Sequence, residues 1–321
     1  MTSNSRIWAA DAAAIAAAAA RLRAGGLVAV PTETVYGLAA RADDGAAVAG
    51  IYAAKGRPSF NPLIVHVADA AMAAQLAEVP PLAAALMARF WPGPLTLVLP
   101  RRADAPLASL VTAGLGTVAL RCPAHAVMQA LIAAVGPLAA PSANASGRIS
   151  PTRAEHVAAS LANVPILDAG PCTAGVESTI LAVEGEGWRL LRPGAVPVEA
   201  IAAMAGPPLT PLAVGESPSP ARGEGVIAPG MLESHYAPDQ PVRLEAATAT
   251  ADEYHIGFGP VSGDATLSAT GDLTEAAARL FDLLHVAQAS GRAGIAVAPV
   301  PRHGLGLAIN DRLQRAAAPR L

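Results

Sequence analysis

Lysine is nearly absent from this sequence of 321 residues: among its 22 lysine and arginine residues, only Lys55 is a lysine. Aromatic residues are also scarce, at 3%, although hydrophobic residues make up 53% of the chain. Alanine, valine and leucine must therefore fill the interior, and each remaining aromatic is expected to have a specific task. A sequence that keeps one lysine among so many arginines is expected to need a compact ammonium at that position.

Neither sign of charge is in large excess, because the formal net charge is −3 at pH 7. A broad basic face for nucleic acid is therefore not expected, although a local basic pocket is compatible with this charge. Cysteine is equally scarce. Cys122 and Cys172 form no C-x-x-C pair, which argues against a disulfide framework and a structural zinc site. A reducing cytoplasm is the expected compartment.

Long apolar runs are missing as well. The alanine-rich stretch Ala9–Ala20 contains Asp11 and is followed by Arg21 and Arg23, so it indicates an amphipathic surface helix and not a signal or membrane segment. No membrane association is expected.

Several common motifs are absent. The chain has no GxxxxGK[ST], and no intact GxGxxG follows a strand, which excludes a P-loop nucleotidase and argues against a dinucleotide cofactor. HExxH, GxSxG and clustered histidine or cysteine ligands are also missing, which removes the commonest hydrolase and zinc-enzyme classes.

Short β-rich runs alternate with helical runs from residue 27 onwards, which is typical of an α/β fold. The expected strands are Leu27–Val30, Leu63–Val67, Leu95–Leu99, Thr117–Leu120, Leu138–Ala140, Ile166–Leu167, Ser178–Val183 and Trp188–Leu191, with helices near 46–54, 70–77, 82–89, 126–135 and 154–161. The last two strands are close enough for a hairpin, so the sheet is expected to be mixed. Residues 1–205 form the predicted first domain.

A break in composition follows this domain. Residues 206–238 are rich in proline and glycine and are expected to form an extended linker. Residues 239–321 then form a smaller predicted α/β domain, with strands near 242–244, 254–258 and 294–298 and helices near 273–289 and 307–316.

The lone lysine lies in Lys55–Leu63, where Gly56 ends a helix and two prolines stiffen the loop before the next strand. This loop presents Lys55, Arg57, Ser59 and Asn61 at a sheet end, where α/β proteins tend to bind ligands. A solvated surface turn is the equally weighted alternative for this segment alone.

Other polar groups lie at the ends of strands. Thr32, Thr34 and Tyr36 follow the first strand of the alternating region, where the threonines could equally be helix caps. The remaining groups are Arg121, Ser142, Asn144, Ser146, Arg148, Ser150, Ser178, Thr179 and Arg192, together with His66, which could equally be a core histidine. Three of the eleven aromatics, Tyr36, Tyr52 and Phe60, are expected to form a pocket wall. Together these residues predict a cavity for a polyanion and a small polar molecule, such as a nucleotide attacked at its α-phosphate.

These motifs resemble those of the YrdC-like threonylcarbamoyl-AMP synthases, in the long form that carries a C-terminal extension. The segments similar to that family are Pro31–Leu38, Lys55–Val67, Trp91–Thr96, Thr117–Pro123, Ala140–Asn144, Gly175–Ile180 and Leu191–Gly194, in this order. Signatures of the long form are similar to Pro229–Met231, His235–Pro238 and Ala308–Arg312. The resemblance covers almost the whole chain, and short members end near residue 205.

The resemblance implies an open twisted α/β sheet with a concave basic cavity, followed by a Rossmann-like domain. It implies that L-threonine, bicarbonate or CO2, and ATP are condensed to threonylcarbamoyl-adenylate and pyrophosphate. The product would then supply the tRNA threonylcarbamoyl-transferase machinery, with any RNA binding by this chain weak or transient. Mg²⁺ is expected to accompany ATP, and the resemblance assigns it no ligands.

Residue roles follow from the same resemblance. L-threonine would be held by Thr32, His66, Arg121, Ser142 and Ser178, and ATP by Lys55, Ser59, Thr117, Asn144, Ser150, Arg192 and Tyr236. The expected catalytic residues are Lys55, Arg57, His66 and Arg148, of which the two arginines would neutralise phosphate or bicarbonate. His66 and the substrate carboxylate are both open as the acceptor of the threonine amine proton.

A carbamate decomposes in water, so the site is expected to close during the reaction, with the linker as lid and Tyr236 over the nucleotide. Many long-form members carry basic residues after the linker's Pro-Gly-Met, whereas this chain has Leu232, Glu233 and Ser234.

Two alternatives are kept. The carbamoyltransferase that matures hydrogenases contains a similar domain, but it also needs zinc-finger cysteines and an acylphosphatase-like module that this chain lacks. An RNA-binding or ribosome-assembly factor of the same fold is the alternative outside enzymes, and the near-neutral charge makes that a secondary property.

Overall fold

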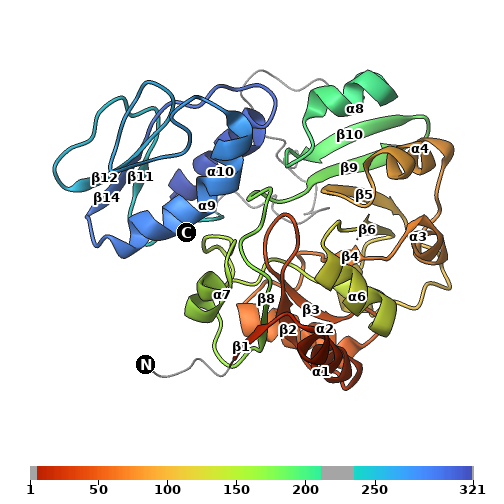
Figure 1. Cartoon of the computed structure of the whole chain (residues 1–321). Helices are drawn as coiled ribbons and strands as arrows, with labels where there is room; N and C mark the ends of the chain where they lie inside the picture. The colour runs from red at the N-terminus through yellow and green to blue at the C-terminus, as the bar shows by residue number, and fades with distance from the viewer. Residues whose placement is uncertain (1–5, 211–234, 320–321) are drawn as a thin grey trace.

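The larger of two α/β units is built on a ten-stranded mixed sheet (Figure 1). The computed structural model describes residues 6–210 and 235–319. The strands of this sheet are β1 (Ile7–Ala9), β2 (Val28–Val30), β3 (Gly37–Arg41), β4 (Ile64–His66), β5 (Leu95–Pro100), β6 (Thr117–Arg121), β7 (Leu138–Ala139), β8 (Ile166–Asp168), β9 (Thr179–Glu184) and β10 (Gly187–Arg192). Their order across the sheet is β1-β8-β2-β3-β7-β4-β6-β5-β9-β10. The predicted mixed sheet and its β9–β10 hairpin are confirmed.

The helices of this unit are α1 (Ala12–Arg23), α2 (Gly45–Lys55), α3 (Ala70–Leu76), α4 (Pro81–Phe90), α5 (Ser109–Thr112), α6 (Ala126–Val135), α7 (Ala154–Ser160) and α8 (Val198–Ala205). Aspartates cap three of them: the carboxylates of Asp11, Asp44 and Asp69 accept hydrogen bonds from the first-turn amides of α1, α2 and α3. Helix α2 ends at Gly56, whose φ of +59° suits glycine and turns the chain directly after Lys55.

Alternation along the strands divides the core between the two faces of the sheet. In β2, Val28 and Val30 belong to an apolar cluster with residues of α1 and α6, whereas Ala29 faces the opposite cluster. The same alternation occurs in β3, where Ala39 faces one cluster and Leu38 the other. These fully buried positions are filled mainly by alanine, valine and leucine, as the composition predicted.

One small apolar cluster lies on one face of the half of the sheet that ends at β10. It contains Ile64, Val98, Ala119, Ile180, Ala182 and Leu191, from five neighbouring strands. Two residues beyond Ile64 and Ala119 on the same face are His66 and Arg121, which stand opposite each other in the β4–β6 register. Because side chains alternate between the two faces of a strand, the polar side chains of His66 and Arg121 lie at the edge of this apolar cluster.

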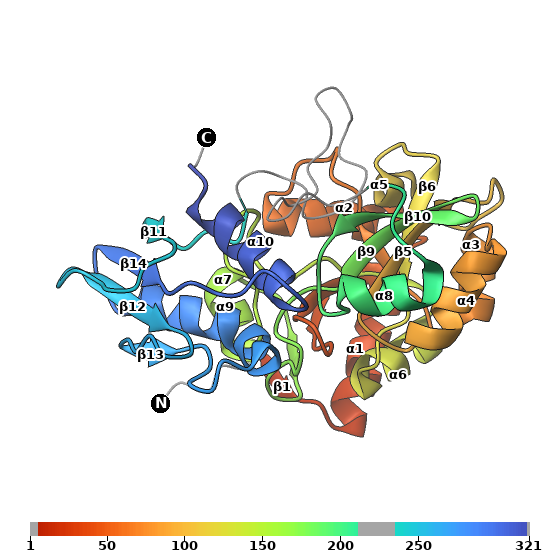
Figure 2. The same ribbon diagram turned by 90° about the horizontal axis from the view of Figure 1, so that it is seen from above.

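The smaller unit has a four-stranded parallel sheet in the order β11-β14-β12-β13. Its elements are β11 (Val242–Arg243), β12 (Glu253–Gly257), β13 (Ala265–Thr266), β14 (Gly294–Val297), α9 (Leu273–Ala289) and α10 (Gly306–Ala317). Helices α9 and α10 lie between this sheet and the larger unit (Figures 1 and 2). The apolar core around them also includes Val35, Ile149 and Val176 of the larger unit, so the two units share buried surface.

Some elements escaped the sequence analysis. Strand β3 begins inside a stretch interpreted as a turn, and β1, β13, α5 and α8 were not predicted. Most of the predicted linker, residues 211–234, lies outside the described residues, as do Leu232, Glu233 and Ser234. Within the described ranges, no helix is both long enough and apolar enough to span a membrane.

Candidate functional site

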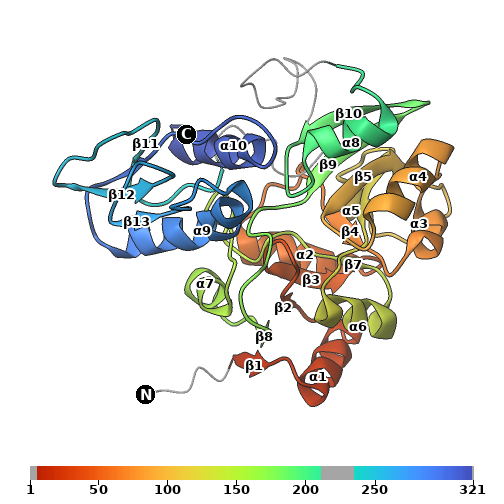
Figure 3. The same ribbon diagram turned by 45° about the horizontal axis from the view of Figure 1, so that its top comes forward.

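A polar cavity of about 50 Å³ lies over the face of the large sheet that carries Ile64, His66 and Arg121. Its walls come from β4, the ends of β6 and β10, the loops after β2, α2 and β7, the segment before β9 and residues 235–236. The lining residues are Thr34, Val35, Arg57, Ile64, His66, Arg121, Ala140, Pro141, Ser142, Glu177, Ser178, Arg192, His235 and Tyr236. Residues far apart in the sequence therefore meet here, with α10 of the smaller unit close by (Figure 3).

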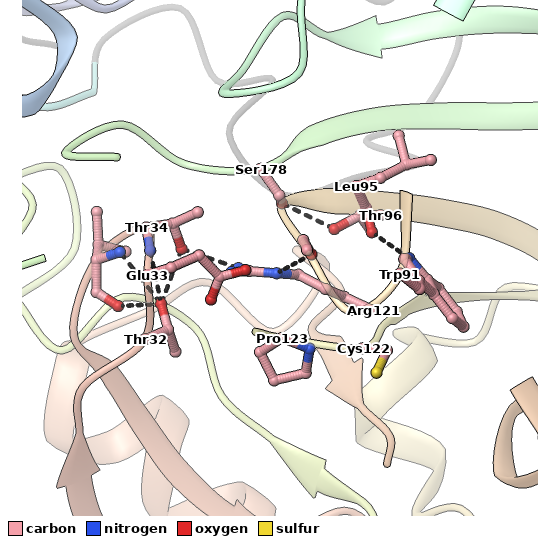
Figure 4. Close-up of polar contacts among 12 residues, drawn as sticks. Thr32, Glu33, Thr34, Trp91, Leu95, Thr96, Arg121, Cys122, Pro123 and Ser178 are labelled. Atoms are coloured by element: carbon pink, nitrogen blue, oxygen red, sulfur yellow. Dashed lines mark hydrogen bonds and ion pairs between the residues drawn. The ribbon is translucent and has the colours of Figure 1, made fainter. Parts of the chain in front are cut away.

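Arg121 is held at one end of the cavity by groups from two loops (Figure 4). Its Nη2 lies 2.9 Å from Oε1 of Glu33, its Nη1 donates to Oγ1 of Thr34 at 2.9 Å, and its Nε donates to the carbonyl of Gly93 at 3.3 Å. Burial alone would raise the pKa of Glu33, but the adjacent Arg121 lowers it below its ordinary value. The pair is therefore ionised at neutral pH.

Thr32 shapes the loop that carries Glu33. Its Oγ1 donates to the carbonyl of Val35 at 2.7 Å and accepts from the amides of Thr34 at 3.1 Å and Val35 at 3.3 Å. The hydroxyl is thus used in a local turn, of the kind in which a threonine side chain fixes its own backbone. Thr32 positions Thr34 and does not itself line the cavity.

Ser178 directly precedes β9 and lines the cavity together with Arg121. Its hydroxyl lies 2.7 Å from that of Thr96 on β5, and its carbonyl accepts from Arg192 at 2.9 and 3.2 Å. Gly194 allows this arrangement, because a Cβ there would lie 2.3 Å from the backbone of Ser178 and Thr179.

Three buried cations stand at the other end of the site. Arg57 is 9% exposed and donates to Oδ1 of Asn61 at 2.6 Å and to the carbonyl of Pro62 at 2.8 Å; burial lowers its pKa to about 10. Lys55 is 4% exposed, and its Nζ donates to the carbonyls of Ser142, at 2.6 Å, and Asn144. Burial, with Arg57 nearby, places the pKa of Lys55 well below its ordinary value. Arg192 completes the group at the end of β10.

His66 lines the cavity and stands opposite Arg121 in the β4–β6 register. Burial, reinforced by the positive charge of Arg121, lowers the pKa of His66 to about 3. The imidazole is therefore neutral at physiological pH and can accept or donate one hydrogen bond without adding charge.

His235 and Tyr236 cover the three cations. Tyr236 is 1% exposed, and its ring lies 5.3 Å from the guanidinium of Arg312 and 5.5 Å from the ring of Phe281. Its φ of +63° is in the left-handed region, which costs a non-glycine residue on the order of 1 kcal/mol. Burial and the adjacent cations Arg57, Lys55 and Arg192 place the pKa of His235 well below its ordinary value.

Seven of the fourteen residues to which the resemblance gave a role line this cavity: Arg57, His66, Arg121, Ser142, Ser178, Arg192 and Tyr236. Thr32, Lys55, Asn144 and Ser150 are buried directly behind the lining. Ser59 is exposed on the loop after α2, and Thr117 is half-buried at the start of β6. Arg148 is exposed and forms an ion pair with Asp239 at the boundary between the units.

The expected aromatic wall is wrong. The Tyr36 hydroxyl donates to the carbonyl of Gly170 at 2.8 Å, and that of Tyr52 to the carbonyls of Asn61 and Leu110, so both rings are parts of the core. Phe60 is 58% exposed. The aromatic that lines the cavity is Tyr236.

Sequence reasoning assigned no site role to Glu33, Glu177 and Arg312. The first two are neighbours of residues that it did select, Thr32 and Ser178, and Arg312 ends the signature Ala308–Arg312. A search for ionisable residues inside these motifs could have found all three. Among residues 6–210 and 235–319, no group of three or more histidine, cysteine, aspartate or glutamate side chains is placed to hold a metal ion.

Comparison with known proteins covers both units. Residues 20–194 match the family model Sua5/YciO/YrdC, described as "Telomere recombination", and residues 196–318 match the "Threonylcarbamoyl-AMP synthase, C-terminal domain". The threonylcarbamoyl-AMP synthase of Bacillus subtilis is 44% identical over 330 aligned residues, which cover 96% of this chain and 94% of the relative. The chain belongs to the threonylcarbamoyl-AMP synthase family.

A second family member, from Pyrococcus abyssi, is 41% identical over 95% of this chain and 94% of its own length. The crystal structure of P. abyssi Sua5 with L-threonine superposes with a TM-score of 0.84 over 94% of both chains, at 39% identity. This similarity confirms the ten-stranded sheet and the separate four-stranded domain as the fold of the synthase family. Full-length HypF shares the fold alone, with a TM-score of 0.50 at 20% identity over 29% of its length.

Proposed function

We propose that this chain condenses L-threonine, bicarbonate or CO2, and ATP into threonylcarbamoyl-adenylate with release of pyrophosphate. The observation that carries the proposal is the match to threonylcarbamoyl-AMP synthases across both units, at 44% identity with the B. subtilis enzyme. The two cationic ends of the cavity fit this reaction, because one substrate brings a carboxylate and the other a triphosphate.

Arg121 is the proposed partner of the threonine carboxylate. Its guanidinium is pre-oriented by Glu33 and Thr34, and Ser178, Ser142 and His66 line the cavity around it. Thr32 contributes by fixing the loop that carries Glu33 and Thr34. The P. abyssi relative crystallised with L-threonine supports the substrate assignment.

Arg57 and Arg192 are the proposed partners of the ATP phosphates. Lys55 lies behind them and holds the carbonyls of Ser142 and Asn144, so we assign it the placement of that loop against the phosphates. Ser59, Thr117, Ser150 and Tyr236 are proposed to contact other parts of the nucleotide. Arg148 must leave Asp239 before it can help to neutralise phosphate or bicarbonate.

The first proposed step forms a bond between the threonine nitrogen and the carbon of bicarbonate or CO2; with bicarbonate, water is released. Holding the two reactants together supplies most of the acceleration. His66 is neutral, since its pKa is about 3 in the absence of substrate, and can accept a hydrogen bond from the threonine amine. Arriving anionic substrates would raise its pKa and make it a better proton acceptor.

In the second step an oxygen of the carbamate attacks the α-phosphorus, and the bond to the leaving pyrophosphate breaks. Buried cations stabilise the charge that moves onto the leaving group. Mg²⁺ would arrive with the phosphates of ATP, where it neutralises part of their charge.

Closure of the site is proposed to depend on His235 and Tyr236. Both residues line the cavity beside Arg57 and Arg192, so we propose that they move to admit ATP. The left-handed φ of Tyr236 is consistent with a segment that changes conformation. Truncation after Gly206 is expected to slow synthesis and to raise pyrophosphate release relative to adenylate formed; unchanged values would remove the lid role.

We also propose a cytoplasmic location for this chain and a recipient for its product. The two cysteines are free and buried, which is consistent with a reducing cytoplasm. The unstable product would pass to the tRNA threonylcarbamoyl-transferase machinery.

The test is pyrophosphate release measured with each of ATP, threonine and bicarbonate omitted in turn. Release should require all three and should fall at least tenfold in Arg121→Met. The matched control is Arg101→Met, at a half-buried arginine directly after β5 that does not line the cavity. Salt-sensitive RNA affinity without turnover would instead favour the RNA-binding alternative.

A further inference from the structure

Helix α10 of the smaller unit carries three charged side chains that are all buried. Asp311 is 1% exposed, Arg312 is 0% and Arg315 is 7%. Charged residues are almost never buried so completely without partners. Nε of Arg315 donates to Oδ1 of Asp311 at 3.0 Å, and the other oxygen of Asp311 accepts from Arg312. Asp311 thus holds both guanidinium groups on one side of the helix.

Arg312 crosses from the smaller unit into the larger one. Its Nε donates to Oε2 of Glu177 at 2.8 Å, and its Nη1 donates to the carbonyl of Pro193 at 2.9 Å. Glu177 precedes Ser178 and lines the cavity, while Pro193 follows Arg192. One side chain of α10 therefore contacts two strand-end segments of the site.

Glu177 extends this connection to Ser150. Its second oxygen, Oε1, accepts a hydrogen bond from the Ser150 hydroxyl at an oxygen–oxygen distance of 2.6 Å. Burial alone would raise the pKa of Glu177, but Arg312 and Arg192 outweigh it, and the pKa lies below its ordinary value. The carboxylate is therefore ionised and can accept both hydrogen bonds, which fixes the direction of the Ser150 hydroxyl.

The same guanidinium contacts Tyr236. The Arg312 Cζ lies 5.3 Å from the centroid of the Tyr236 ring, within the range of a cation–π interaction. The backbone amide of His235 also donates to the carbonyl of Arg315 at 3.2 Å. Helix α10 thus holds both residues that cover the cations.

We propose that Arg312 is a positioning residue for the nucleotide: through Glu177 it orients Ser150, and through its contact with Tyr236 it holds the cover in place. This inference rests on the proposed synthase activity and on Ser150 and Tyr236 facing ATP. It gives the smaller unit a task, because the nucleotide half of the site is complete only when α10 is docked. The Arg121 guanidinium, which is proposed to bind the threonine carboxylate, has no hydrogen-bond or ion-pair partner on α10 within the described residues, since its partners there are Glu33, Thr34 and Gly93 of the larger unit.

The contacts of Arg312 therefore predict that its replacement changes the KM for ATP much more than the KM for threonine. Arg312→Met should raise the KM for ATP at least tenfold and leave the KM for threonine within about twofold. Arg312→Lys keeps the charge but loses the planar fork, so it should give an intermediate KM for ATP. Because Arg312 acts through Glu177, the double variant Glu177→Gln/Arg312→Met should raise the KM for ATP no more than Arg312→Met alone.

The control is Arg279→Met on α9, which removes an exposed pair with Glu275 and should leave both KM values unchanged. Thermal melting of each variant reports its folding. If Arg312→Met does not fold because Glu177 is left unpaired, the same comparison of the two KM values is made with Arg312→Lys and with the double variant.

A fall in kcat with an unchanged KM for ATP, or an equal rise in both KM values, would identify a merely structural role and overturn the proposal. A parent protein without activity would instead refute the proposed synthase activity, and this outcome is distinct from a failure of the proposed role of Arg312.

Discussion

Replacing Glu33 by glutamine removes the negative charge that faces Arg121. The two side chains are 12% and 5% exposed, and their charged atoms are 2.9 Å apart. Loss of one partner from a buried pair leaves an uncompensated charge, which typically costs 3–5 kcal/mol. Glutamine keeps one oxygen acceptor, so we expect a loss near the lower limit, about 3 kcal/mol. For a unit of this size that corresponds to a fall in Tm of roughly 6–12 °C.

The carboxylate of threonine should compensate the charge of Arg121 that the substitution leaves without its Glu33 partner. In Glu33→Gln the Tm should therefore rise more on addition of threonine than it does in the parent, because a tighter Kd gives a larger stabilisation at the same concentration. Differential scanning calorimetry with and without threonine measures both effects. Glu184→Gln, in an exposed pair with Arg189, is the control and should change little. An unchanged Tm, or a smaller response to threonine, would refute the placement of the carboxylate at Arg121.

Three further predictions concern the loop behind the cations, the backbone beside Ser178 and the buried histidines. Lys55→Arg should lower the rate of pyrophosphate release at least tenfold, since a guanidinium does not fit between the carbonyls of Ser142 and Asn144. A rate equal to that of the parent would mean that the function does not require lysine at this position. Gly194→Ala should lower the free energy of unfolding by about 1–3 kcal/mol and raise the KM for threonine, because the added Cβ would clash with the backbone of Ser178. The control is Gly116→Ala, where an added Cβ meets no atom within 4 Å. Equal melting temperatures for the two variants would contradict the clash. Stability should fall as pH drops below 6.5, because burial lowers the pKa of His66 and His156 to about 3 and that of His235 well below 6.5, so these side chains bind protons only after unfolding. Each contributes up to about 1.4 kcal/mol per pH unit, and a flat melting profile between pH 7 and 5 would exclude this.

The alternation of apolar runs predicted most of the large sheet, because strands such as β5 and β6 are rich in leucine and valine. Strand β3 was missed since Gly37–Arg41 contains no β-branched residue, and its pairing with β2 and β7 decides its conformation. Tertiary pairing of this kind overrides local propensity.

The motifs located the site, but they could not say which atoms face the cavity. Lys55 was expected at the phosphates, and the structure places its ammonium against two carbonyls because the αL turn at Gly56 ends its helix beside that loop. Arg312 lies 135 positions from Glu177, so no local pattern reveals their contact. Tyr36 was misplaced because an aromatic beside a motif can serve the core equally well.

The most direct measurement is mass spectrometry of the adenylate formed when the full chain is incubated with ATP, bicarbonate and each amino acid in turn. With threonine, the product should have the mass of threonylcarbamoyl-adenylate and should gain one mass unit from ¹³C-bicarbonate. Serine lacks the methyl group of threonine, a difference that typically contributes about 1–3 kcal/mol to discrimination, so the serine product should form at least tenfold more slowly. Absence of the threonine adduct, or equal formation of the serine adduct, would contradict the proposed function.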